Sequence, residues 1–83
     1  MQVLLHGSLM ADRASTNREI ERAFGLPDRS ITSPESLLNA LATHPPARVI
    51  WQGHGAAVAA LGLYADRIEA ALGRLEQFDL DID

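Results

Sequence analysis

Prolines divide the first half of this chain into short segments, and this division limits what the chain can fold into. A proline cannot continue a helix, and it disfavours the helical conformation in the residue before it. The Gly-Leu-Pro at 25–27 therefore predicts a helix end, because glycine can adopt the left-handed conformation after a last turn. Ser33 followed by Pro34 predicts a helix start, with a capping hydroxyl before a proline at the first helical position. The Pro-Pro pair at 45–46 must end this second helix near Thr43.

The helix before the first proline is predicted to run from about residue 16 to 24. Thr16 and Glu19 have the spacing of a capping box, in which a hydroxyl and a carboxylate three residues apart satisfy free amides. Spacing of i, i+3 and i+4 then places three apolar side chains on one face: Ile20, Ala23 and Phe24.

Three segments have the composition of β-strands. Residues 2–5 are a short continuous apolar run, which suits a strand buried on both faces. Residues 48–51 lie between the double proline and a glycine turn, and they are rich in β-branched and aromatic side chains. Residues 78–83 alternate strictly between apolar and acidic, which predicts a strand with one buried face and charges that protect a sheet edge.

The segments between these strands are predicted to be helical. Residues 33–43 place Leu37 and Leu41 on a core-facing side, residues 56–61 form a short helix, and residues 65–77 form a longer one. Together with Tyr64 just before it, the longer helix has an apolar face of Ile68, Leu72 and Leu75. Strands joined by helical crossovers imply a parallel sheet with right-handed connections. We therefore expect an α/β fold, with a three-stranded parallel sheet and three to four helices in a single domain over residues 1–83.

This domain must be stabilised by packing alone. None of its 83 residues is a cysteine, which excludes disulfides and thiolate-bound zinc. The first ten residues have no basic start, and His6 and Gly7 break their apolar run, unlike a secretory signal. No segment approaches the run of about 20 apolar residues that a membrane-spanning helix needs. We therefore expect a cytoplasmic protein.

The net charge of −4 arises from seven arginines, no lysine and eleven acidic residues. Nucleic-acid-binding domains usually have a basic surplus, so neither nucleic acid nor a membrane is expected as a partner. An acidic excess is complementary to a basic protein partner and would speed their encounter. The same balance is also common among soluble proteins that have no such partner.

Catalytic and metal-binding motifs are not found in this sequence. The three histidines do not have the i, i+4 spacing of a helical metal motif, and no spacing places Ser8 or Ser30 against a base. The Gly-His-Gly at 53–55 resembles a tight turn with a solvated histidine more than a phosphate-binding loop. The acidic positions in 76–83 alternate along a strand, so they cannot surround a calcium ion. We expect no enzymatic activity, no cofactor and no metal.

The Leu-Pro-Asp at 26–28 and the Pro-Glu-Ser-Leu-Leu-Asn-Ala-Leu at 34–41 resemble the barstar family. This family consists of small intracellular inhibitors of bacterial ribonucleases. The resemblance extends to the order of elements along nearly the whole chain, including a middle strand that ends in Trp51. It implies a three-stranded parallel sheet with helices. It also implies inhibition by blockade, in which the second helix and the preceding loop enter the ribonuclease active site and carboxylates replace RNA phosphates.

Transferred to this chain, the family pattern is only partly kept. Glu35 stands where the family has an aspartate and retains a carboxylate. Asn39 stands at the family's most important aspartate, and an amide brings no charge. The resemblance therefore implies a diverged immunity protein whose target is a different toxin, a class that includes other ribonucleases. The other departures are Arg29 and Ser30 for tyrosines, Ile31 for glycine, Pro34 for leucine and Leu38 for tryptophan.

Helix spacing indicates the same surface independently of the resemblance. Positions i, i+3, i+4 and i+7 of the second helix share one stripe of mixed polar and apolar character beside the preceding loop. In the alternative interpretation, Leu38 is half-buried and Glu35 only complements the helix dipole. The predicted partner-binding residues are Asp28, Arg29, Ser30, Ile31, Pro34, Glu35, Leu38, Asn39 and Ala42.

Two functional hypotheses follow. In the first, the chain is an immunity protein that blocks a basic secreted ribonuclease or a related toxin by docking residues 33–43 and the preceding loop, and it is monomeric when free. In the second, it is a non-inhibitory interaction module or a subunit that self-associates through Leu38, Trp51 or residues 56–61.

Overall fold

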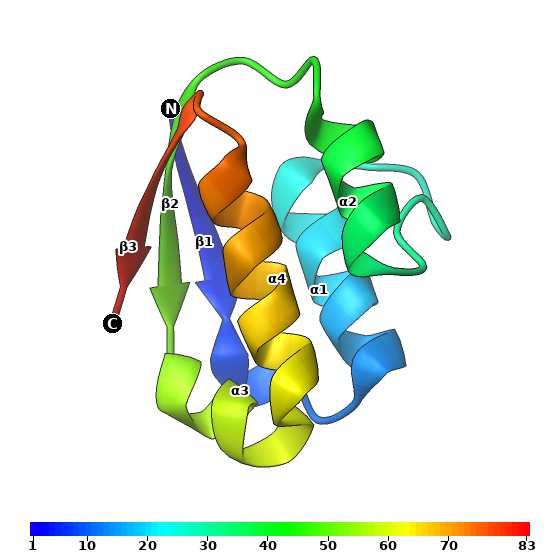
Figure 1. Cartoon of the computed structure of the whole chain (residues 1–83), viewed down its shortest axis with the longest axis vertical. Coiled ribbons are helices and arrows are strands. Elements are labelled where there is room, and N and C mark those ends of the chain that lie inside the picture. Colours follow the sequence, from blue (N-terminus) through cyan, green and yellow to red (C-terminus); the bar gives the residue numbers. More distant parts are fainter.

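The computed structural model describes all 83 residues and forms two layers, a parallel sheet and a layer of helices against it (Figure 1). The sheet has the order β1-β2-β3, and its strands are Gln2–His6, Ala47–Gln52 and Phe78–Ile82. In the register of the sheet, Val3 pairs with Val49 and Val49 pairs with Leu80. The predicted α/β fold with a three-stranded parallel sheet is confirmed.

Four α-helices and one 3-10 turn connect the strands. Between β1 and β2 lie η1 (Gly7–Leu9), α1 (Arg13–Phe24) and α2 (Pro34–Leu41), and between β2 and β3 lie α3 (His54–Leu61) and α4 (Leu63–Arg74). Helices α1 and α4 pack against the sheet, α2 packs against α4, and α3 lies at the carboxyl ends of the strands (Figure 1). None of these helices combines the length and the apolar character needed to cross a membrane.

Only one face of the sheet is covered by helices. Val3 and Leu5 of β1 are buried, whereas Leu4 between them is 40% exposed. The alternation continues in β2, where Val49 is buried and Arg48 is exposed. The prediction that residues 2–5 are buried on both faces was therefore wrong, because the helices cover only one face of the sheet.

The core lies between the sheet and the apolar faces of α1, α2 and α4. Trp51 and Leu5 contribute two of the largest fully buried side chains from the sheet. Ala23 is only partly buried against this core. The predicted helix faces are otherwise confirmed by the burial of Ile20, Phe24, Leu37, Leu41, Tyr64, Ile68, Leu72 and Leu75.

Helix α1 begins three residues before the predicted start. Its N-cap is Asp12, whose Oδ1 accepts the Ser15 amide at 2.8 Å, while the Ser15 hydroxyl accepts the Asp12 amide at 3.0 Å. These contacts with Ser15 hold the pKa of Asp12 below its ordinary value. Thr16 is instead buried inside the helix, where its hydroxyl donates to the Asp12 carbonyl. The capping-box prediction for Thr16 and Glu19 was wrong, because the Glu19 carboxylate binds the His6 amide and the Arg22 guanidinium instead.

Glu19 anchors α1 to the edge of the sheet. Its buried carboxylate accepts the His6 amide at 2.9 Å and two bonds from the Arg22 guanidinium at 2.7 and 2.8 Å. Arg22 also donates to the Leu4 carbonyl. Burial alone would raise the pKa of Glu19, but the bonds from Arg22 and His6 outweigh it, so the pKa lies below its ordinary value.

Helix boundaries elsewhere differ from the predictions by two or three residues. Helix α2 ends at Leu41 rather than near Thr43, and α4 ends at Arg74 rather than at Gln77. Leu75 has the extended values φ −87° and ψ 98°, which end α4 and free the next residues to turn into β3.

We expect Glu19→Gln to lower the free energy of unfolding at pH 7 by about 1–3 kcal/mol, because it removes a charge from buried hydrogen bonds. The folded-state pKa lies below the ordinary value of 4.5. The carboxylate therefore stabilises the fold fully above that pH, and its contribution is lost as the pH falls through the folded-state pKa. Urea unfolding followed by the fluorescence of the single tryptophan at several pH values measures this difference. The exposed Glu76→Gln is the control, and equal effects of the two changes at pH 7 would contradict the anchoring role.

Gly7 is the second constraint at this end of the sheet. A Cβ on Gly7 would fall inside contact distance of the Gly53 carbonyl, whereas a Cβ on Gly55 would meet nothing within 4 Å. We expect Gly7→Ala to lower the free energy of unfolding by about 1–3 kcal/mol, because the backbone must shift. In the matched control Gly55→Ala, in the first turn of α3, the free energy of unfolding should rise by up to about 1 kcal/mol, because alanine has the higher helix propensity. Urea unfolding of both variants tests this, and similar stabilities would show that the close approach is easily relieved.

Candidate docking surface

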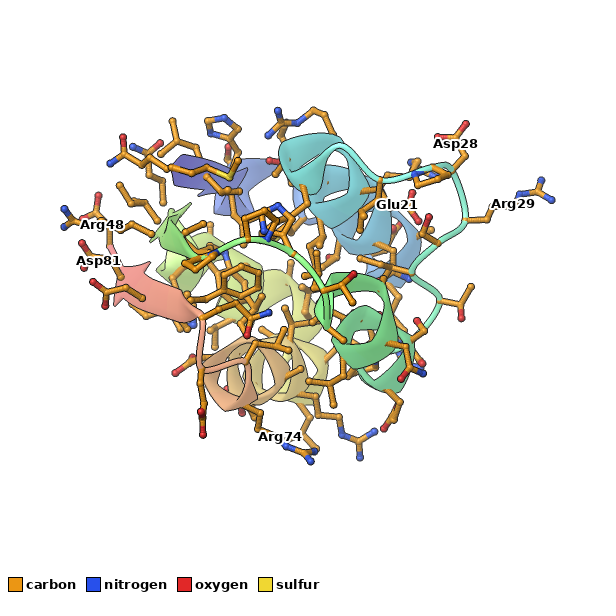
Figure 2. All side chains as sticks on the ribbon, turned by 90° about the horizontal axis from the view of Figure 1, so that it is seen from above. Glu21, Asp28, Arg29, Arg48, Arg74 and Asp81 are labelled. Atoms are coloured by element: carbon orange, nitrogen blue, oxygen red, sulfur yellow. The ribbon has the colours of Figure 1, made fainter.

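The loop between α1 and α2 is held in shape by a buried carboxylate. Glu21 is only 4% exposed, and its Oε2 accepts the backbone amide of Ile31 at 3.0 Å. Figure 2 shows Glu21 between α1 and this loop, with Asp28 and Arg29 extending outward from it. The Ile31 side chain is 2% exposed, so the structure places this predicted partner-binding residue in the core, where it anchors the loop.

Arg29 occupies the tip of the loop in a strained conformation. It is the only non-glycine residue with a positive φ, at 64°. A left-handed conformation costs a residue with a Cβ roughly 1 kcal/mol, so the surrounding structure must hold it. Ser30 supplies part of this restraint, because its amide and its hydroxyl both donate to the Pro27 carbonyl. Ser30 is therefore a half-buried turn residue that supports the exposed Arg29.

Helix α2 begins where its sequence predicts. The Ser33 hydroxyl accepts the Ser36 amide at 3.1 Å, the Ser36 hydroxyl accepts the Ser33 amide at 3.0 Å, and Pro34 takes the first helical position. At the other end, the Gln77 side chain donates to the Leu41 carbonyl at 3.0 Å. The start of α2 is thus capped locally, and its end is bound to Gln77, which precedes β3.

The predicted partner-binding residues of α2 and its C-cap differ in their burial. Glu35, Asn39 and Ala42 are exposed, whereas Pro34 and Leu38 are half-buried. Leu38 packs against the edge of the core, which agrees with the alternative interpretation of that residue. Glu35 lies in the first turn, where a carboxylate complements the helix dipole.

Two hollows flank the start of α2. The first, of about 520 Å³, lies between α1 and the loop, and the second, of about 210 Å³, lies between α2 and α4. The first is lined chiefly by Arg13, Asn17, Arg18, Asp28, Arg29 and Thr32. The second is lined chiefly by Pro34, Glu35, Leu38, Arg67, Ala70 and Arg74. We call the two hollows and the exposed side chains of α2 between them the docking surface.

Arginines gather at these hollows. Arg22 and Arg48 are in ion pairs with Glu19 and Asp81, at 2.7 and 2.6 Å. The other five have no carboxylate oxygen within 4 Å, and all five line one hollow or the other: Arg13, Arg18, Arg29, Arg67 and Arg74. Sequence reasoning missed four of them, although Arg67 and Arg74 share an i, i+7 stripe on α4 with two alanines between them.

Tyr64 joins α4 to α1 beside the first hollow. Its hydroxyl donates to Asn17 Oδ1 at 2.6 Å, and the Arg13 guanidinium lies 5.1 Å from the centre of its ring. Burial raises the pKa of Tyr64, and the charge of Glu35 adds to this, against the opposing effects of Asn17 and Arg13. The phenol therefore stays protonated at neutral pH and continues to donate to Asn17.

The acidic side chains of β3 lie at the other end of the molecule. Figure 2 shows Arg48 and Asp81 at the sheet, on the side opposite Asp28 and Arg29. Asp79 and Asp83 belong to the same strand or its end and are exposed. The net charge of −4 is therefore unevenly distributed, with all five unpaired arginines on the docking surface.

One further polar cluster lies outside the docking surface. His54 at the start of α3 contacts Glu69 at 2.8 Å and is edge-on to the Trp51 ring, with 4.8 Å between ring centres. The prediction of a solvated His54 was wrong, because its side chain is 18% exposed and packs on Trp51. Trp51 is fully buried and its indole N–H has no hydrogen-bond partner. It therefore cannot be the self-association surface considered from the sequence.

No three His, Asp or Glu side chains converge in a way that could hold a metal ion. Comparison with models of known protein families and with curated proteins finds no match. The resemblance to the barstar family therefore rests on the sequence motifs and on the predicted order of elements.

Proposed function

We propose that this chain is an immunity-type protein that inhibits a bacterial ribonuclease or a related toxin by covering it with the docking surface, and that it has no catalytic activity of its own. One observation carries this proposal: α2 and its preceding loop expose polar side chains, while buried contacts hold their backbone in place. In this proposal the protein acts in the cytoplasm and protects the cell that makes the toxin.

Rigidity supports an inhibitory role for the docking surface. Glu21 holds the loop through the Ile31 amide, and the Ser33 cap and Gln77 hold the two ends of α2. Leu37 on the inner side of α2 is fully buried. A surface that is already ordered loses less conformational entropy on binding, so more of its contact energy remains as affinity.

The chemical character of the surface also supports a protein partner. Exposed Glu35 and Asn39 adjoin the partly exposed Leu38 and Pro34. Protein interfaces combine an apolar centre with a polar rim, and they favour arginine over lysine. The cationic side chains that line the hollows are five arginines.

Charge favours a target other than a barnase-type ribonuclease. The family resemblance implies carboxylates that pair with a basic active site, but the carboxylates exposed at the hollows are only Asp28 and Glu35. Five arginines surround them, and like charges brought together at an interface cost several kcal/mol. A toxin with a less basic surface therefore fits this docking surface better.

A self-associating module is the second candidate, and one observation favours it. Leu9 of η1 and Leu63 at the start of α4 are 56% and 72% exposed. Helix α3, which packs against η1 and α4, adds the exposed small side chains of Ala56, Ala59 and Ala60. This apolar area lies at the carboxyl ends of the strands, away from α2 (Figure 1).

Calorimetric titration into two toxins tests the proposal: a barnase-type ribonuclease and the toxin encoded beside the gene for this chain. We expect tight one-to-one binding to the neighbouring toxin, with loss of that toxin's activity. Absence of heat and of inhibition with both toxins would contradict the proposal. A dimer in sedimentation under the same conditions would then support the self-associating module.

A pair of tryptophan substitutions separates the two candidates. Asn39→Trp places a bulky side chain on the docking surface and should weaken toxin binding about tenfold or more, equivalent to about 1.4 kcal/mol. Ala59→Trp makes the same kind of change on α3 and should leave toxin binding unchanged. Both sites are exposed, so thermal stability measured by circular dichroism should change little. If Ala59→Trp rather than Asn39→Trp reduced toxin binding, the docking surface would be misassigned.

A further inference from the structure

We infer that the docking surface binds an acidic segment of its protein partner, with Asp or Glu side chains of that segment seated among the five arginines of the two hollows. This inference rests on the proposed function for the place of docking, but it does not require the partner to be a toxin. It reverses the sign of charge that the resemblance to the barstar family implies for the partner.

The arginines at the hollows are available for a ligand. Those of the first hollow, Arg13, Arg18 and Arg29, have no carboxylate oxygen within 4 Å, although the chain has eleven acidic residues. A guanidinium presents a planar set of donors that matches a carboxylate with two parallel hydrogen bonds. With a volume of about 520 Å³, the first hollow has room for acidic side chains between these donors.

Two of the first hollow's side chains are restrained before a ligand binds. The Arg13 guanidinium lies over the Tyr64 ring, which limits its motion. Asn17, which lines the hollow, uses its carbonyl oxygen to accept the Tyr64 hydroxyl, so its NH₂ group remains available as a donor. The backbone of Arg29 is fixed at the loop tip. Restrained donors lose less entropy when a carboxylate binds.

The second hollow repeats the pattern on α4. Arg67 and Arg74 are seven residues apart, so they are separated by about 10 Å along the helix axis. Acidic residues three apart in an extended segment span about the same distance. Ala70 and Leu38 add apolar side chains to the lining of this hollow.

Acidic protein fits this surface better than nucleic acid does. Single-stranded nucleic acid is bound by exposed aromatic rings that stack on bases, but all four aromatic side chains, Phe24, Trp51, Tyr64 and Phe78, are less than 10% exposed. Asp28 and Glu35 interrupt the basic surface and would repel a continuous phosphate backbone, whereas single carboxylates can avoid them. The acidic side chains of β3 would repel an acidic partner, so the partner would approach the docking surface more often.

A labelled peptide of twelve residues with Glu at every third position and Ala elsewhere is a suitable probe, measured by fluorescence anisotropy at low ionic strength. We expect binding that weakens as salt is added, because exposed charges are screened. Arg29→Gln should weaken it about fivefold or more, whereas the control Arg48→Gln, which removes the same charge at the sheet, should change it less than about twofold. Glu35→Lys should strengthen binding of the acidic peptide, whereas it should weaken binding of a basic, barnase-type partner.

Every outcome decides between the two proposals. Equal effects of Arg29→Gln and Arg48→Gln, no peptide binding at low salt, or tighter binding of a twelve-nucleotide single-stranded RNA would overturn the inference. If the neighbouring toxin bound tightly but was unaffected by Arg29→Gln and weakened by Glu35→Lys, the inhibitor would stand and the acidic segment would be wrong. If the peptide bound through the arginines but no toxin did, the docking chemistry would stand and the inhibitory function would be wrong.

Discussion

The docking surface depends on one interaction, the acceptance of the Ile31 amide by the buried carboxylate of Glu21. A buried carboxylate is costly unless hydrogen bonds satisfy it, so its position and that of its donor are strongly coupled. Two residues earlier on α1, Glu19 binds the edge of β1 through His6 in the same way. Helix α1 thus holds the sheet with one carboxylate and the loop before α2 with the other. The loop tip and the start of α2 consequently take their positions from the sheet, although they lie far from it.

The parts of the fold that could be predicted are those encoded by neighbouring residues. Ser33 and Pro34 start α2 where expected, and Gly25 has the left-handed conformation that ends α1. The start of α1 was missed because Asp12 with Ser15 and Thr16 with Glu19 offer the same spacing, and only tertiary structure decides between them. Glu19 joins a strand 13 residues away, a partner that no local pattern reveals. The one-sided burial of β1 was missed for the same reason, since a run of four apolar residues does not show which faces a helix covers.

The candidate site was predicted in part. Asp28, Arg29, Glu35 and Asn39 are exposed as the spacing suggested, because a helix with Leu37 inward must turn these positions outward or leave them in a loop. Ile31 was predicted to lie at the surface, but its side chain is buried and anchors the loop. Burial of this apolar side chain stabilises a small domain whose core is limited. The arginines of α1 and α4 were missed because they lie on other elements and because a net charge of −4 conceals how the charges are distributed.

On α2, the inward-facing positions determine the stability of the fold, and the outward-facing positions determine which partner it can bind. Leu37 and Leu41 are fully buried in the core, while Glu35 and Asn39 are exposed. A change at an exposed position usually alters stability by less than about 0.5 kcal/mol, whereas a charge pair at an interface contributes about 1.5–7 kcal/mol of coupling energy. The outer stripe can therefore exchange carboxylates for amides, and α4 can acquire arginines, without loss of the fold. A likeness in element order to an inhibitor family thus carries little information about the target, and the sign of the charge at the hollows is the stronger guide to the partner.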